Sequence, residues 1–226
     1  MKPTYHVPFT PAAPDGSCAW DDPLWSRSDP LAVAAFRPES TAHRPVTECR
    51  MLYDDTALYG LFRVQDRYVR SRHTAFQDPV CRDSCVECFL RPDPARGYFN
   101  FEMNAGGALF TSYVTDPTRT SKGFAARELL PAALGRRIKI HSTLPEQVYP
   151  EIEEPLLWLL EFHIPLEVFR AYVPLPDCLA DRPWRANFYK CGDDTSHPHW
   201  AAWAPVPSLN FHLPDHFGSV EFTGRT

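Results

Sequence analysis

Residues 80–104 contain two runs of alternating apolar and polar side chains, and this pattern most constrains what the chain can fold into. Every second residue is apolar from Val86 to Leu90 and again from Phe99 to Met103, with a turn that contains Pro and Gly between the runs. Such alternation is typical of a half-buried β-strand. A short connection of this kind favours an antiparallel pair. The pattern therefore predicts a β-hairpin with one face in a hydrophobic core.

The opposite face of this predicted hairpin carries short polar side chains, namely those of Glu87, Asn100, Glu102 and Asn104. Solvated strand faces more often carry Lys and Thr. Short side chains on rigid strands lose little conformational entropy when they bind, which suits weak and directional contacts. We therefore interpret this face as one that meets a polar ligand.

The chain has 226 residues, which suits one large all-β domain. Apolar residues make up 44% of it, enough for a sizeable core, and its 24 prolines favour many loops and few long helices. We predict a single domain over residues 1–226, an antiparallel β-sandwich of jelly-roll or immunoglobulin-like architecture with one or two short helices. Residues 1–14, which are rich in Pro, are expected to be irregular.

Further strands and helices are predicted from the same kinds of pattern. Alternation favours a second hairpin, and a near-continuous apolar run favours a central strand that is covered on both faces. A proline in the first turn marks a short helix after this run. The predicted strands are residues 46–53, 58–66, 108–113, 138–142, 156–164, 184–190 and 219–222, the predicted helices are 125–133 and 165–169, and residues 146–155 are predicted to form a loop.

Charge and cysteine content argue against several classes of partner. The formal net charge of −5 disfavours a nucleic-acid-binding protein, because phosphate contacts need a basic surface. The longest apolar run, residues 155–160, is too short to cross a membrane, and no apolar segment of a signal peptide is visible. Seven cysteines, an odd number without a regular framework, favour a reducing compartment such as the cytoplasm. We therefore expect no nucleic-acid partner and no membrane partner.

No metal site is predicted from the sequence. Cys85 and Cys88 have a C-x2-C spacing, but they point to opposite faces of a strand, which does not suit zinc. The four histidines between residues 197 and 216 are interrupted by prolines, so hydrogen bonding to the backbone in loops is the favoured interpretation. The acidic pairs at 21–22 and 193–194 could donate oxygens to calcium, but turn capping explains both.

Several motifs occur in one order along almost the whole chain, from about residue 15 to residue 222. They are Asp83-Ser-Cys-Val-Glu-Cys-Phe-Leu90, Tyr98-Phe-Asn-Phe-Glu-Met-Asn-Ala-Gly106, Trp184-Arg-Ala-Asn-Phe-Tyr-Lys-Cys-Gly-Asp193 and Phe211-His-Leu-Pro-Asp-His-Phe-Gly218. This series resembles carbohydrate-binding module family 9 and its stand-alone family 9-like relatives. The resemblance implies a β-sandwich without catalysis that binds a sugar, with structural calcium in some members.

The chain departs from the family pattern at the sugar site. The family clamps a sugar between two tryptophans, whose places correspond here to Val80 or Cys81 and to Phe211. The family glutamate matches Glu87, but the arginine of the next strand is replaced by Glu102, which reverses the charge. The resemblance therefore predicts the fold of this chain, but it does not identify the ligand.

The predicted ligand-binding residues combine the polar strand face with aromatic side chains. Strand parity predicts that polar residues of three strands form one solvent-facing patch, with an aromatic ring at its edge. Aromatic rings suit sugars because pyranose C–H groups pack on the ring face while hydroxyls reach a polar rim. Trp200 is a further candidate platform, and a core position is the alternative for Trp203. The predicted set is Glu87, Asn100, Glu102, Arg185, Asn187, Tyr189, Phe211 and Trp203.

Two other functions stay open from the sequence. Paired carboxylates act as acid and base in glycosidases, so a glycoside-active enzyme that uses Glu87 and Glu102 is one alternative. The missing clamp tryptophan motivates the other, a protein-interaction sandwich that has lost sugar binding. A non-catalytic domain that binds a mono- or oligosaccharide is favoured over both, while the identity of the sugar and the oligomeric state are left open.

Overall fold

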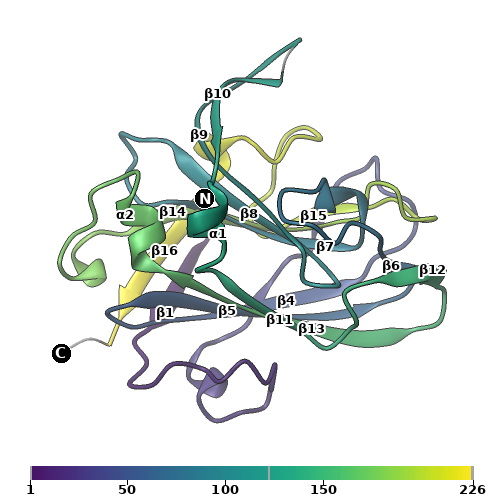
Figure 1. The fold of residues 1–226 in the computed structure, drawn as a ribbon, viewed down its shortest axis with the longest axis horizontal. Coiled ribbons are helices and arrows are strands. Elements are labelled where there is room, and N and C mark those ends of the chain that lie inside the picture. Colours follow the sequence, from purple (N-terminus) through teal and green to yellow (C-terminus); the bar gives the residue numbers. More distant parts are fainter. Residues whose placement is uncertain (1, 122, 225–226) are drawn as a thin grey trace.

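Two β-sheets pack face to face in the computed structural model, which describes residues 2–121 and 123–224 (Figure 1). The strands of the larger sheet are β1 (Thr4–Pro8), β3 (Ala35–Phe36), β7 (Cys85–Arg91), β8 (Tyr98–Asn104), β9 (Leu109–Thr120), β10 (Gly123–Leu129), β14 (Trp184–Cys191), β15 (Trp200–Ala202) and β16 (Gly218–Thr223). Its main path runs β1–β16–β14–β7–β8–β9–β10, and β15 pairs with both β14 and β3.

The smaller sheet has the order β11–β13–β5–β4–β2, and β12 and β6 form a separate pair. Its strands are β11 (Lys139–Ser142), β13 (Leu156–Pro165), β5 (Ala57–Asp66), β4 (Val46–Tyr53) and β2 (Leu31–Ala32), and the separate pair is β12 (Val148–Ile152) and β6 (Val69–Ser71). The α-helices are the short α1 (Ala132–Gly135) and α2 (Leu166–Arg170). No helix among the described residues is long and apolar enough to cross a membrane.

The hairpins predicted from alternation are confirmed. β4 pairs with β5 and β7 pairs with β8, each in antiparallel register. The alternate side chains from Val86 to Leu90 and from Phe99 to Met103 belong to the main hydrophobic core, as predicted. The all-β sandwich with short helices is confirmed as well, and the parallel pairing of β1 with β16 is an exception to its antiparallel character.

Three local predictions are wrong. Residues 1–14 are not irregular throughout, because they contain β1, which pairs with the last strand of the chain. The helix expected at 125–133 is strand β10 followed by the short α1, since β10 pairs with β9 in a long hairpin. The loop expected at 146–155 contains β12, which pairs with β6. In each case pairing with another strand, rather than local propensity, sets the backbone conformation.

The main core between the sheets is rich in aromatic side chains. Trp158, Phe162, Trp184 and Phe188 are fully buried in it. The ring of Phe162 lies over Gly60, where an added Cβ would come within 2.1 Å of the ring, so this close approach needs a glycine. Because such dense packing leaves side chains little freedom, the larger sheet offers a rigid outer face.

The outer face of the larger sheet is covered in part by residues 203–217. Val206 and Phe217 of this segment pack on Phe89, Tyr98 and Tyr189 in a second apolar cluster. The polar strand face is therefore largely buried, and the expectation of an open, solvent-facing patch is wrong. The covering segment follows β15 without regular alternation, so its course over the sheet has no local signal. The β9–β10 hairpin extends away from the sandwich on this side (Figure 1).

Candidate functional site

A cavity of about 260 Å³ remains between the outer face of the larger sheet and the segments that cover it. Side chains of β7, β8 and β14 reach it from the sheet, while β9, β15 and residues 209–212 supply its walls. Its lining consists of carboxyl, thiol, aromatic and cationic groups. These belong to Cys81, Glu87, Glu102, Arg119, Cys191, Asp193, Trp200, Leu209, Asn210, Phe211 and His212.

Two carboxyl groups face each other on the floor of this cavity. Glu87 of β7 and Glu102 of β8 are directly paired in the antiparallel register, and they are only 2% and 7% exposed. Side chains that are directly opposite on such a pair have Cβ atoms about 4.5–5.5 Å apart. Two carboxylates this close cannot both ionise without repulsion, so the pair favours at least one protonated member.

Burial is the main cause that raises the pKa of both carboxyl groups. It raises the pKa of Glu102 to about 7, against the opposing effect of a hydrogen bond from Asn100. It raises the pKa of Glu87 well above its ordinary value, and the charge of Glu102 adds to this rise. Burial also raises the pKa of the neighbouring Asp193. Near neutral pH the floor therefore retains protons, and its carboxyl groups can donate as well as accept hydrogen bonds.

The position of Glu102 is fixed by polar contacts beneath the cavity. Asn100 Nδ2 donates to Glu102 Oε1 at 2.6 Å. Asn100 Oδ1 accepts from the main-chain N–H and the hydroxyl of Ser112 at 2.9 and 2.5 Å. Because Asn100 is itself fully buried, it positions Glu102 from behind and does not line the cavity.

Two aromatic side chains border the cavity. Phe211 stacks on Tyr189 with ring centroids 4.0 Å apart and 11° between the ring planes. The Tyr189 hydroxyl donates to the main-chain carbonyl of Phe211 at 2.8 Å, and Trp200 Nε1 donates to Asp193 Oδ1 at 2.7 Å. Stacking and hydrogen bonds thus hold both rings at fixed places on the cavity wall.

The β9–β10 hairpin brings positive charge to the cavity. Arg119 lines the cavity and lies over the ring of Phe124, 4.1 Å from its centroid. Burial, followed by the charges of Arg119 and Arg127, lowers the pKa of His212 to about 3. His212 is therefore neutral near neutral pH, and its Nδ1 is hydrogen-bonded to the Tyr98 hydroxyl at 2.8 Å. Arg119 remains as a cationic hydrogen-bond donor beside the two carboxyl groups.

Five of the eight predicted ligand-binding residues meet at or directly behind this cavity. Glu87, Glu102 and Phe211 line it. Asn100 lies behind Glu102, and Tyr189 lies behind Phe211. Glu87, Glu102 and Tyr189 share one face of the sheet, as strand parity predicted, although the covering segment turns that face into a pocket.

Asn187 and Arg185 lie away from the cavity. Asn187 is fully buried and exchanges two hydrogen bonds of 2.9 Å with the main chain of Ala204, which ties the covering segment to β14. Arg185 pairs with Arg91 at the opposite end of β14 from Cys191. At about 3.3 Å per residue, this separation is roughly 20 Å along the strand.

Trp203 occupies a core position instead of the cavity wall. Its ring lies against Gly218 and makes edge contacts with Tyr5 and Phe188, at centroid distances of 6.4 and 5.8 Å. Strand parity explains this position. Trp200 pairs with Cys191 and points to the same outer face. Trp203 lies three residues further along the chain and therefore points to the inner face. The structure therefore places Trp200, and not Trp203, at the cavity.

Sequence reasoning missed Arg119, Asp193 and Cys191 as cavity residues. Arg119 follows a stretch without alternation, and only the extension of β9 into a long hairpin brings it over the sheet. Cys191 had a usable signal, because it shares the parity of Tyr189 on β14. Asp193 lies two residues beyond the end of that strand, where turn capping was the favoured interpretation.

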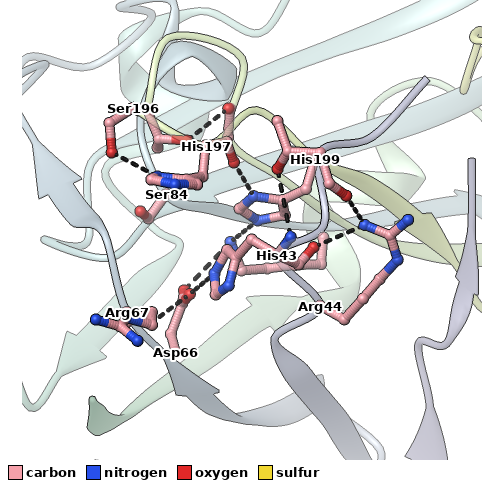
Figure 2. Close-up of polar contacts among 12 residues, drawn as sticks. His43, Arg44, Asp66, Arg67, Ser84, Ser196, His197 and His199 are labelled. Atoms are coloured by element: carbon pink, nitrogen blue, oxygen red, sulfur yellow. Dashed lines mark hydrogen bonds and ion pairs between the residues drawn. The ribbon is translucent and has the colours of Figure 1, made fainter. Parts of the chain in front are cut away.

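A second buried polar cluster lies on the inner side of the larger sheet (Figure 2). Asp66 Oδ1 contacts His43 Nε2 at 2.8 Å, and its Oδ2 contacts Lys190 Nζ at 3.4 Å. Lys190 Nζ is also 2.8 Å from His199 Nε2, and Trp158 Nε1 donates to Asp66 Oδ2 at 3.2 Å. This network connects the two sheets, because Asp66 belongs to the smaller sheet and Lys190 to the larger one.

The polar residues first considered for metal binding are therefore distributed over separate sites. Among the described histidines of residues 197–216, His199 belongs to the inner network and His212 to the cavity. Asp22 Oδ1 accepts from the main-chain N–H of Leu24 at 2.7 Å, as turn capping predicts. Structural calcium, implied by the resemblance for some family members, stays a prediction for this chain.

Comparisons with known proteins agree with this architecture. A family model for carbohydrate-binding family 9 matches residues 29–222. A solved structure from Bacteroides uniformis, described as a candidate carbohydrate-binding protein, aligns with a TM-score of 0.82 and 24% identity over 99% of this chain and 100% of its own. No curated protein sequence matches the chain.

Two further solved structures are of a carbohydrate binding module family 9 domain from Caldicellulosiruptor kristjanssonii. The complex with glucose aligns with a TM-score of 0.65 and 15% identity, over 99% of this chain and 97% of its own. The complex with cellotriose aligns with a TM-score of 0.67 and 15% identity, over 99% of this chain and 95% of its own. At these identities the solved structures establish a shared fold. Since the family model covers most of the sequence, the chain belongs to carbohydrate-binding family 9.

Proposed function

We propose that this chain binds a mono- or oligosaccharide, without catalysis, in the cavity on the outer face of the larger sheet. The observation that carries the proposal is the combination of a carboxyl floor with two fixed aromatic rings, Trp200 and Phe211, around one cavity. Family membership and the sugar-bound relatives support the ligand class. Trp200 is a candidate to supply the half of the aromatic clamp that the sequence lacks at Val80 or Cys81.

The chemistry of the lining suits a sugar. The C–H faces of a pyranose ring pack on aromatic rings, while its hydroxyls need both donors and acceptors at the rim. Glu102, whose pKa is raised to about 7 chiefly by burial, can serve either way near neutral pH. Arg119, which lines the same cavity, adds guanidinium N–H groups that can donate to sugar hydroxyls.

The proposal is tested by isothermal titration calorimetry with glucose, cellobiose and cellotriose on the wild-type chain and two variants. Trp200→Ala is expected to weaken binding about tenfold, which corresponds to about 1.4 kcal/mol. The matched control is Tyr149→Ala, which removes an aromatic side chain that is 67% exposed and does not line the cavity. This control is expected to bind as the wild type does.

Two outcomes contradict the proposal. One is the absence of binding by the wild type to any sugar of a broad panel, and the other is unchanged affinity in Trp200→Ala. Nuclear magnetic resonance of the sugar after incubation separates binding from the alternative function. An intact sugar is expected, whereas hydrolysis that disappears in Glu102→Gln would establish a glycoside-active enzyme.

A further inference from the structure

Two thiols and a carboxyl group meet at the cavity, where Glu87 and Cys191 belong to the lining and Cys85 lies against them. Single ligand atoms of Cys85, Glu87 and Cys191 all lie within 4.8 Å of one another, and all three residues are buried. Within residues 2–121 and 123–224, this is the one group of three or more His, Cys, Asp or Glu side chains that meets so closely. We propose that these three side chains bind one divalent cation of the zinc class.

Strand register explains why the three side chains converge. Cys85 of β7 pairs with Cys191 of β14, so both thiols point to the outer face of the sheet. Glu87 lies two residues further along β7 and therefore has the same parity. Cys191 Sγ donates to Glu87 Oε1 at 3.2 Å. Within the part of the chain that the structure describes, the other polar contacts given for these thiols are weak ones to each other and to main-chain carbonyls.

The donor set and the spacing suit a tetrahedral ion. Zn–S bonds of about 2.3 Å and Zn–O bonds of about 2.0–2.2 Å place neighbouring ligand atoms roughly 3.5–3.8 Å apart. The observed cluster therefore needs only small side-chain rotations to close around an ion. Two sulfur ligands favour zinc-class ions over calcium and magnesium, which prefer oxygen.

The cavity provides access and a fourth ligand position. Glu87 and Cys191 both line it, so an ion held by the three side chains would face the open space with one position free for water. Glu102 and Asp193, which line the same cavity, place further carboxyl oxygens nearby. The buried cation of β14, Lys190, is already paired with Asp66 on the inner face.

The protons balance without any redox step. Binding of one divalent ion displaces the two thiol protons, and the proton of Glu87 where it is present, to solvent, and two S–M bonds and one O–M bond form. Cys49 and Cys88 differ from this pair, because they are buried in the apolar core away from the cavity.

The test is a titration of the fully reduced chain with Co²⁺, followed by absorption spectroscopy. The expected result is one equivalent of Co²⁺ per chain, with the charge-transfer band of thiolate ligands and the visible bands of tetrahedral cobalt, and bleaching of both by Zn²⁺. Cys85→Ser and Cys191→Ser are expected to lose the charge-transfer band or weaken it severely. Cys178→Ser, which changes a partly exposed thiol outside the cavity, is the matched control and should keep it.

The wild-type titration decides the matter even if a variant fails to fold. Absence of the thiolate band in the reduced wild type overturns the proposal, and so does a band that persists in a folded Cys85→Ser, Cys191→Ser double variant. A Cys85–Cys191 disulfide in the purified chain, together with no metal uptake after its reduction, also overturns it. Since no sugar enters these measurements, their failure is distinguishable from failure of the proposed sugar binding.

Discussion

Two buried polar clusters lie on opposite faces of the larger sheet, and they differ in how their charges are matched. In the inner network, Asp66 meets His43 (Figure 2). It also pairs with the oppositely charged Lys190 of the other sheet. On the floor of the cavity, Glu87 and Glu102 are like-charged neighbours in register. Matched charges are typical of a structural network, whereas carboxyl groups that are buried together beside a cavity are candidates for a functional site.

The two clusters also contribute to stability with opposite dependence on pH. Burial, followed by the charge of Lys190, lowers the pKa of His199 to about 3 from an ordinary 6.5. This group therefore contributes stability above pH 6.5, and the contribution is lost as the pH falls from 6.5 towards 3. Glu102 has the reverse sign, because its pKa is raised from 4.5 to about 7. Its contribution is complete below pH 4.5 and is lost as the pH rises through 7.

The largest expected effect follows from breaking the inner network at its cation. Lys190→Met should lower the free energy of unfolding by about 3–5 kcal/mol, because it leaves Asp66 as a buried carboxylate without its ion pair. Chemical denaturation at neutral pH measures this loss. The double variant Asp66→Asn, Lys190→Met is the control and should recover a large part of it. Equal losses in the single and double variants would show that packing, and not charge, is what the network provides.

A smaller effect is expected where the network loses one donor and an aromatic ring stays in the core. Trp158→Phe keeps an aromatic ring in the core but removes the Nε1–H group that donates to Asp66 at 3.2 Å. Hydrogen bonds to charged groups contribute about 1.5–3 kcal/mol, so a loss of about 2 kcal/mol is expected in the same denaturation assay. Phe162→Leu provides a comparison in the same core without a polar contact. If Trp158→Phe were as stable as the wild type, the hydrogen bond to Asp66 would make no contribution to stability.

A mutation on the cavity floor is expected to raise the free energy of unfolding instead of lowering it. Glu102→Gln keeps the oxygen that accepts from Asn100 but cannot ionise. At pH 8 the variant is expected to be more stable than the wild type by about 1 kcal/mol or more, since one pKa unit corresponds to about 1.4 kcal/mol. At pH 4.5 and below the two should be equally stable. Denaturation curves across this range check the sign, and parallel profiles would contradict the buried-carboxyl account.

The same contrast shows which features the sequence could predict. Alternation correctly assigned Val86 and Phe188 to the core and Glu87 and Tyr189 to the opposite face, because strand parity is a local property. The burial of that opposite face was not predictable in this way. It depends on residues 203–217, which cross the sheet without regular alternation and are held by contacts such as that of Asn187 with Ala204.

The inner network and the cavity walls were not predictable from strand parity either. Lys190 has the parity of the core, so a charged residue there signals a buried partner, but nothing local identifies Asp66, which lies far away in the sequence. Arg119 is similar, because its place at the cavity depends on the course of a long hairpin. Once the register of β15 with β14 is known, parity places Trp200 on the outer face and Trp203 on the inner face. That register depends on contacts between residues far apart in the sequence.

The smallest expected effect distinguishes the cavity from the polar face as a whole. Arg185 and Arg119 are both arginines on the larger sheet, but Arg119 lines the cavity and Arg185 pairs with Arg91 at the other end of β14. Arg119→Ala should weaken sugar binding roughly fivefold, or about 1 kcal/mol, through loss of one donor. Arg185→Ala should leave the affinity unchanged and alter stability by no more than about 0.5 kcal/mol. Calorimetry on the two variants tests this pair, and a loss of affinity in Arg185→Ala alone would move the binding site away from the cavity and along the strand.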